Sequence, residues 1–150
     1  MKFGEPTLAP TQWIEFTLHA DSVDLFLQEG EIGTLDDLNT INQQINQDIQ
    51  PLADVQISDP WTLYPKQGRC GDYALTKRHE LLLAGWPSSA LLLAEVIIGD
   101  GQHHAVLLAR IDEEWVLDNR VSVLRHPKLT GYKWLKIQNP ENPMFWIECS

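Results

Sequence analysis

The sequence predicts one α+β domain over residues 1–150, with N-terminal helices packed on a C-terminal antiparallel sheet. The chain has 150 residues, 43% of them hydrophobic, which is enough to bury one core but thin for two domains. The first half carries apolar residues at helical spacing, whereas hairpin-linked apolar runs follow Pro87. Helices followed by strands is the order typical of an α+β domain.

The first predicted elements are short helices over Gln12–Leu18 and Val23–Leu27. A longer amphipathic helix is predicted from Asp36 to about Gln50, because Thr34 offers a hydroxyl cap with an acid three positions on. The apolar residues of this helix recur at helical spacing and are Leu38, Ile41, Ile45 and Ile49. Its Asn, Gln and Asp residues are expected to form a solvated face that takes no part in chemistry.

The middle of the chain leads to a helix that begins beside a cysteine. Prolines interrupt regular structure around Ser58–Pro60, and Trp61–Gly68 is predicted to be a loop. A second long helix is predicted over Gly71–Ala84, followed by a glycine and a proline that end it. Cys70 therefore stands at the N-terminus of this helix.

Strands are predicted in the remainder of the chain. Tight turns at Gly99–Gly101 and Asp112–Glu114 separate the first three, which indicates antiparallel hairpins. The predicted strands are Ala90–Ile98, His104–Ile111, Trp115–Asp118, Tyr132–Ile137 and Met144–Glu148.

The charge balance argues against two classes of partner. The 11 Lys and Arg residues against 21 Asp and Glu residues give a formal charge of −10, and the basic residues are scattered along the chain. Such a chain lacks the cations that neutralise phosphates and is repelled by an anionic membrane surface. No apolar run approaches the length that spans a bilayer, and the first ten residues do not resemble a secretion signal. We expect no nucleic acid and no membrane as partners, and a cytoplasmic location.

Cys70 is the candidate nucleophile. It lies 79 positions from Cys149, a spacing that fits neither a disulfide framework nor a zinc knuckle. The free N–H groups and the dipole at a helix N-terminus stabilise a thiolate and can bind the oxyanion of an acyl-transfer intermediate. Gly68 and Gly71 remove side chains where a substrate carbonyl would approach the backbone. Most cysteines at helix starts only pack, so a catalytic role also requires a base.

That base is predicted on the strand that packs against the helix. His103 and His104 open this strand, and only one of them can face Cys70 because side chains alternate in a strand. Asp118 ends the next strand, where it can orient the imidazole across the hairpin. A zinc site made of Cys70 and the two histidines is disfavoured, because the histidines diverge and no fourth ligand stands at useful spacing.

A cysteine at a helix start, with histidine and aspartate on adjacent strands, is shared by papain-type and transglutaminase-type enzymes. The chain resembles more specifically the bacterial transglutaminase-like cysteine proteinase family, whose LapG-type members release surface adhesins. The likeness covers about residues 34 to 120. It is carried by Ile41–Asn46, Asp59–Thr62, Gly68–Ala74, His104–Leu107 and Val116–Asn119.

The resemblance implies a papain-like or transglutaminase-like fold and a role for each member of the triad. Cys70 would be the nucleophile. His104, rather than His103, would be the general base and acid. Asp118 would fix the tautomer of the imidazole. A thioester acyl-enzyme would then form on a peptide or protein substrate, which makes the chain a cysteine peptidase or amidase.

Further residues are expected near the substrate and the oxyanion, namely Trp61, Arg69, Gly71 and Asp72. Trp61 is expected either to line the cleft, to shield the Cys–His pair from water, or simply to pack in the core. Asp72 is expected to order the helix start. LapG-type members carry acids beside the nucleophile that are linked to a calcium requirement, whereas Arg69 and Gly71 supply no oxygen ligand. We therefore expect no metal and no cofactor.

Two other functions stay open at this point. A transglutaminase or a glutamine deamidase would use the same triad, because the triad does not encode the acyl acceptor. A peptide-binding module without turnover would keep the same fold. The oligomeric state is not specified by the residues.

Overall fold

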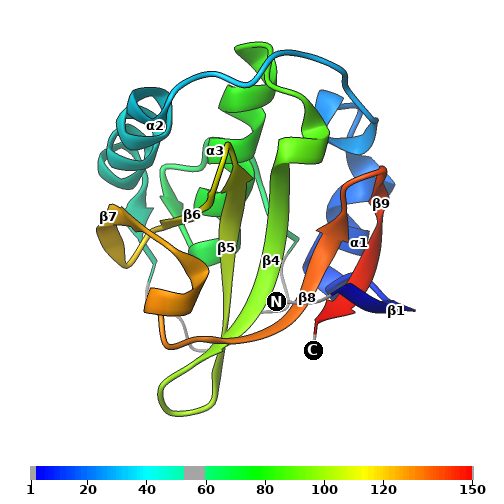
Figure 1. The fold of residues 1–150 in the computed structure, drawn as a ribbon. Helices are drawn as coiled ribbons and strands as arrows, with labels where there is room; N and C mark the ends of the chain where they lie inside the picture. The colour runs from blue at the N-terminus through cyan, green and yellow to red at the C-terminus, as the bar shows by residue number, and fades with distance from the viewer. Residues whose placement is uncertain (1–2, 53–59, 150) are drawn as a thin grey trace.

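The structure, a computed structural model, describes residues 3–52 and 60–149. Its centre is a seven-stranded antiparallel sheet in the order β1-β9-β8-β4-β5-β6-β7. The strands are β1 (Phe3–Thr7), β4 (Leu91–Ile98), β5 (Gln102–Arg110), β6 (Glu114–Asp118), β7 (Val121–Arg125), β8 (Lys133–Asn139) and β9 (Asn142–Cys149). The helices are α1 (Thr11–His19), α2 (Leu35–Asp48) and α3 (Cys70–Leu83). They lie on one side of the sheet, which confirms the α+β class (Figure 1).

Some elements were not predicted from the sequence. Both β1 and β7 lie at the edges of the sheet, and a short parallel pair joins β2 (Gln50–Pro51) to β3 (Gln67–Gly68). The second predicted short helix is a single 3₁₀ turn over Val23–Leu25. None of the described helices has both the length and the apolar character that a membrane crossing requires.

α2 begins with the predicted cap. The Thr34 hydroxyl accepts a hydrogen bond from Asp37 N at 3.2 Å, and the Asp37 carboxylate accepts one from Thr34 N at 2.9 Å. Leu38 and Ile45 are buried on its inner face. The expectation that the polar residues of this helix only face solvent is wrong, because Asn42 is completely buried.

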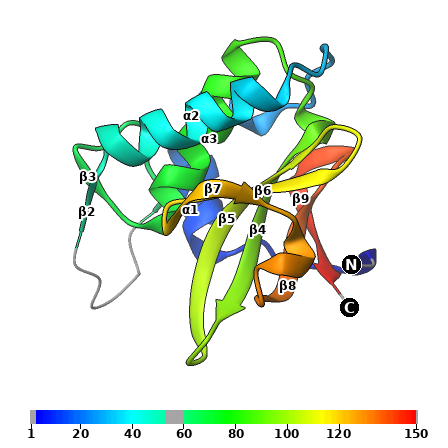
Figure 2. The same ribbon diagram turned by 60° about the vertical axis from the view of Figure 1, so that its left-hand side comes forward.

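α3 is the central helix of the molecule. It lies between the sheet and α2, as Figure 2 shows. Every residue from Gly71 to Arg78 is buried, because both sides of this stretch are covered. The helix is followed by Gly85, whose φ of +100° lets the chain turn back toward the sheet.

The central strands are buried on both faces. Leu93, Leu107 and Leu117 pack in the cluster beneath the helices, whereas Val106 and Val116 pack in a second cluster on the other face. This alternation places β4, β5 and β6 in the middle of the core, so side chains at their ends are held in fixed directions.

Candidate active site

Cys70 is the first residue of α3 and is half-buried. β6 pairs with β5 only from Leu107 to Arg110, which leaves the beginning of β5 open beside the end of the helix. There the Ala105 N–H donates a hydrogen bond to Cys70 Sγ at 3.4 Å. The nucleophile candidate thus lies against the strand that carries the histidines.

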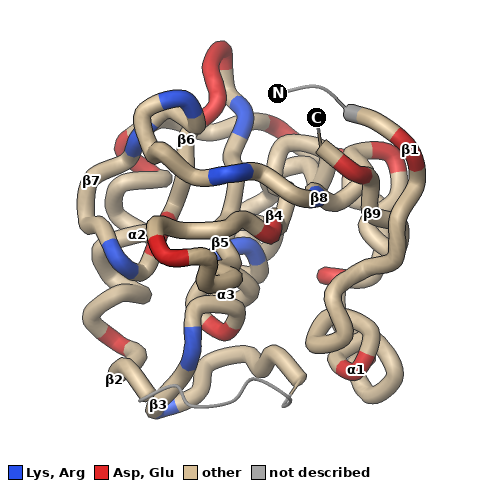
Figure 3. Tube along the Cα trace, turned by 90° about the horizontal axis from the view of Figure 1, so that it is seen from below, with Lys and Arg blue, Asp and Glu red and all other residues tan. Residues whose placement is uncertain are grey.

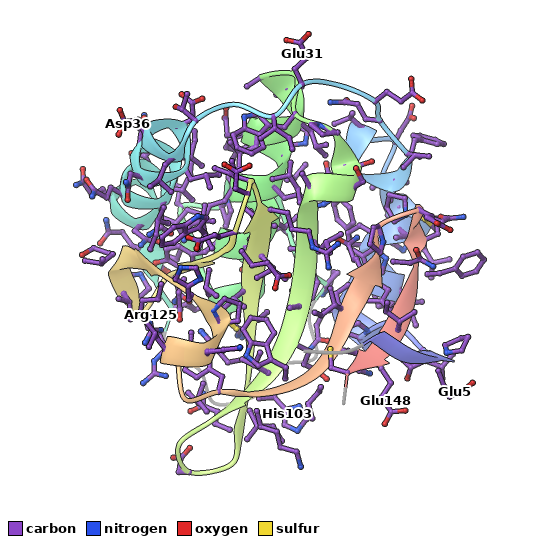
Figure 4. All side chains as sticks on the ribbon, viewed as in Figure 1. Glu5, Glu31, Asp36, His103, Arg125 and Glu148 are labelled. Atoms are coloured by element: carbon purple, nitrogen blue, oxygen red, sulfur yellow. The ribbon has the colours of Figure 1, made fainter. Side chains whose placement is uncertain are left out.

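The structure brings His104 to Cys70 and leaves His103 outside. His104 is only 6% exposed, and its imidazole interacts electrostatically with the Cys70 side chain. The side chain of His103 is 61% exposed and lies 3.7 Å from the Glu95 carboxylate. Figure 4 shows His103 on the outer surface, near the β4–β5 hairpin. The alternation of the strand therefore separates the two histidines.

Asp118 holds the other side of the imidazole. Its Oδ1 lies 2.8 Å from His104 Nε2, and Asp118 is 1% exposed. Because a carboxylate can only accept, Nε2 carries the proton of this hydrogen bond and Nδ1 is the nitrogen left for Cys70. The backbone N–H of Arg120 donates to the same Oδ1 at 2.9 Å.

Two residues that the sequence did not indicate complete the shell of Asp118. Tyr132 Oη donates to Asp118 Oδ2 at 2.5 Å, and Arg125 Nη2 lies 3.3 Å from the same oxygen. Arg125 also donates to Tyr132 Oη at 3.0 Å. The tyrosine ring meets the His104 imidazole edge-on at 5.9 Å. Neither residue belongs to a motif, and only the pairing of β7 with β6 brings Arg125, labelled in Figure 4, to the acid.

These contacts determine the charges of His104 and Asp118. Burial disfavours the charged imidazole, but the hydrogen bonds to Asp118 and Cys70 outweigh it and raise the pKa of His104 to about 9. Burial likewise acts to raise the pKa of Asp118, but the hydrogen bonds from His104, Tyr132 and Arg120 N lower it to about 2. At neutral pH the site therefore holds an imidazolium beside an ionised carboxylate.

The Trp61 indole occupies the space over the start of α3. A Cβ at Gly71 would lie 1.9 Å from Trp61 Nε1, so the glycine makes room for the indole. We expected this glycine to let a substrate approach, and the position of the indole corrects that interpretation. Trp61 is 6% exposed and packs against Trp146 with ring centroids 6.4 Å apart. Asp59, the first residue of the Asp59–Thr62 segment that contributes to the family likeness, lies outside the described residues.

Asp72 ties this loop to the helix. Its Oδ1 accepts from Thr62 N at 2.7 Å, and its Oδ2 accepts from Arg69 N at 2.9 Å. Asp72 is 8% exposed and the Thr62 hydroxyl also donates to its Oδ1 at 3.3 Å, so its place is structural. Trp61 and the helix start are thereby held in one arrangement.

Comparison with known proteins gives a family and a set of similar structures. The family model described as bacterial transglutaminase-like cysteine proteinase BTLCP matches residues 3–150. Among curated proteins, no match to the chain was found. Calcium-bound Legionella pneumophila LapG matches with a TM-score of 0.67 and 22% identity, over 79% of this chain and 71% of that one. EGTA-treated LapG from the same organism matches with a TM-score of 0.64 and 21% identity, over 81% and 70%.

The residues beside Cys70 do not fit a calcium site. Arg69 is a cation, and any side chain at position 71 would enter the space of Trp61. Within the part of the chain that the structure describes, no group of three or more His, Cys, Asp or Glu residues is arranged to hold a metal ion.

Proposed function

Because the chain belongs to the bacterial transglutaminase-like cysteine proteinase family, we propose that Cys70, His104 and Asp118 are the catalytic triad of a peptidase. The chain is a cysteine peptidase-like hydrolase, and its family implies a protein substrate. The triad assigns a role to each of the three side chains.

The first half of the reaction makes a thioester. The Cys70 thiolate attacks the carbonyl carbon of the scissile amide, and backbone N–H groups at the helix start stabilise the oxyanion. The imidazolium of His104 then gives the proton on Nδ1 to the departing amine, because a neutral amine leaves far more readily than an anion. The C–N bond breaks and the acyl group stays on sulfur.

The second half releases the acyl group. Neutral His104 takes a proton from water, the hydroxide oxygen attacks the thioester carbon, and the C–S bond breaks to regenerate the thiolate and the imidazolium. Asp118 keeps the proton on Nε2 throughout, so that Nδ1 is always the nitrogen that faces the reacting atoms.

One observation carries the proposal: a single imidazole bridges the thiol and a buried carboxylate. His104 Nε2 lies 2.8 Å from Asp118 Oδ1, the same ring interacts electrostatically with Cys70, and the N–H of the next residue, Ala105, donates to Cys70 Sγ at 3.4 Å. Three residues far apart in sequence rarely meet in this order for packing alone, since burying a charged pair is costly unless every group finds a partner.

Thiol reactivity tests the Cys–His pair. Cys149 provides an internal reference, because burial raises the pKa of its thiol to about 11 and keeps it protonated at neutral pH. We expect iodoacetamide to label Cys70 at least tenfold faster than Cys149, and His104→Ala to slow only the labelling of Cys70. Equal and slow labelling of both cysteines would remove the basis of the proposal.

Cleavage tests the reaction itself. A peptide library or a proteome digest incubated with the wild-type chain should give new N-termini that the Cys70→Ala variant does not give. A primary amine added to the same mixture distinguishes the other chemistries, because a transglutaminase would attach it to glutamine and a deamidase would convert glutamine to glutamate. Peptide products that persist in Cys70→Ala would refute the assignment of the nucleophile.

A further inference from the structure

A buried polar seam joins α2, α3 and the turn between β6 and β7. It consists of Asn42 and Asn46 on α2 and Lys77 on α3. Asn42 and Lys77 are both completely buried, at 0% exposure, and Asn46 is partly buried. The two asparagines are four residues apart, so they lie on the same side of their helix.

The asparagines of the seam donate hydrogen bonds to backbone carbonyls of residues 118–122. Asn46 Nδ2 donates to the Asp118 carbonyl at 3.1 Å. Asn42 Nδ2 lies 3.2 Å from the Ser122 carbonyl and 3.4 Å from the Val121 carbonyl. All three carbonyls belong to the segment that begins with the acid of the proposed triad, so α2 fixes where this segment runs.

Lys77 decides which way the Asn42 amide faces. Its Nζ donates to Asn42 Oδ1 at 2.7 Å. Charged or neutral, the Lys77 amine has N–H groups to donate, and a carbonyl can only accept, so the amide oxygen faces Lys77 and the amide nitrogen faces the Val121 and Ser122 carbonyls. The reversed amide would set donor against donor and acceptor against acceptor in a buried place, where unmatched polar groups are expensive.

A lysine in this position is costly for the fold. Burial lowers its pKa to about 7, although the negative charge of Asp118 acts in the opposite direction. An apolar side chain of similar volume would avoid this desolvation. A residue that stabilises the fold so poorly and yet orients a specific amide points to a role in function.

The same helix also carries the nucleophile. Lys77 follows Cys70 by seven residues on α3, so the helix that positions the thiol at its start also reaches, through Asn42, the turn that positions the acid. We propose that Lys77 is a positioning residue that, through Asn42, holds Asp118 against His104. This inference rests on the triad proposed above.

The experiment reads the position of Asp118 through the titration of His104. Cys70, Asp118 and the Tyr132 ring face this imidazole, and its raised pKa depends first on the hydrogen bond to the acid. In Lys77→Met the donor to Asn42 is removed while the volume is kept. We expect the His104 pKa, measured by NMR of the ring, to fall by about one unit or more toward its ordinary value of 6.5.

Kinetics and rescue separate positioning from stability. In Lys77→Met, kcat for peptide hydrolysis should fall about tenfold or more with KM nearly unchanged, while the melting temperature stays equal or rises. Lys77→Gln, whose amide can still donate to Asn42 Oδ1, should restore most of the His104 pKa. Lys136→Met is the matched control, because that lysine contacts Glu95 and the Leu8 carbonyl instead.

The outcomes distinguish this inference from the proposed function. A folded Lys77→Met with unchanged His104 pKa and kcat would overturn it. If that variant does not fold, Asn42→Leu makes the same test from the other end of the contact, and an unchanged His104 pKa there would likewise overturn it. Failure of the proposed function would show instead in the wild-type chain, as the absence of Cys70-dependent hydrolysis, while the His104 titration could still be followed.

Discussion

The two oxygens of the Asp118 carboxylate contact different groups. One oxygen faces His104 and Arg120 N, and the other faces Tyr132 and Arg125. Full hydrogen bonding of both oxygens keeps the group ionised and prevents it from rotating. The residues on the second oxygen thus act on the imidazole through the acid.

Replacing Tyr132 with phenylalanine tests this division. The change removes one charge-assisted hydrogen bond from Asp118 Oδ2 and leaves the ring against His104. We expect kcat/KM to fall roughly tenfold, because hydrogen bonds to charged groups contribute about 1.5–3 kcal/mol and Arg125 compensates in part. Tyr64→Phe is the control, since its hydroxyl donates to Glu80 at the same length of 2.5 Å. Equal losses in both variants would contradict a specific role for Tyr132.

The pH dependence of hydrolysis should report His104. Its pKa of about 9 keeps the imidazolium, which in the proposed mechanism protonates the leaving amine, through the neutral range. Acylation should therefore fall as the pH rises through about 9, measured as kcat/KM for an amide substrate. If kcat/KM instead falls with a pKa near the ordinary histidine value of 6.5, Asp118 does not stabilise the charged ring in solution.

At the scale of elements, the start of α3 depends on the positions of Trp61, Gly71 and Asp72 relative to one another. The Trp61 indole fills the place of a side chain at Gly71, and Asp72 fastens the loop that carries the indole. The helix end that holds Cys70 therefore depends on a loop from outside the helix.

A methyl group at position 71 should disturb this assembly. In Gly71→Ala the new Cβ would meet three indole atoms at 1.9 to 2.4 Å, so either Trp61 or the helix start has to move. We expect a loss of about 2 kcal/mol or more in the free energy of unfolding, with slower alkylation of Cys70. Gly99→Ala, where nothing lies within 4 Å, is the control. In a Trp61→Ala background, Gly71→Ala should lower the free energy of unfolding only slightly. If the losses from the two substitutions simply add, the contact between Trp61 and position 71 is not the cause.

The sequence predicted the elements whose pattern is local. The cap of α2, the helix after Cys70 and the hairpin strands β4 to β6 all follow from spacing and turn residues. β1 and β7 were missed, because edge strands are short and their pairing partners are set by topology.

The same limit applies to the site. The approach of His104 and Asp118 to Cys70 could be predicted, because Cys70 begins α3, His104 lies near the start of β5 and Asp118 ends β6. Asn42 and Lys77 could not, since a polar residue on an amphipathic helix looks solvated until its partner on another helix is known. Every residue has a backbone carbonyl, so the sequence does not indicate which carbonyls Asn42 binds.

At the scale of the whole molecule, two buried cations make stability depend on pH in opposite directions. Both the acidic and the basic residues are distributed along the trace (Figure 3). Lys77 has a folded pKa of about 7 against 10.5 in a free chain, so the unfolded state binds more protons and stability rises with pH between these values. His104 has a folded pKa of about 9 against 6.5, so its contribution is complete below 6.5 and is lost as the pH rises through 9.

The two contributions should nearly cancel between about pH 7 and 9 in the wild-type chain. In His104→Gln only the Lys77 contribution remains, and the free energy of unfolding from urea titrations should rise across this interval by up to about 3 kcal/mol. His103→Gln, which changes an exposed histidine, should keep the flat profile of the wild type. A flat profile in His104→Gln as well would mean that neither group is perturbed as described.

The order of strands in the sheet also bears on how the chain is made. β4 to β7 pair with neighbours that follow one another in the sequence, so their hairpins can close as soon as they leave the ribosome. β1 pairs only with β9, and β8 is what links β9 to β4. Because β1 precedes the other described strands of this sheet and β9 follows them, β1 cannot pair until β9 has been made, and the strands that bear His104 and Asp118 can assemble before the opposite edge of the sheet.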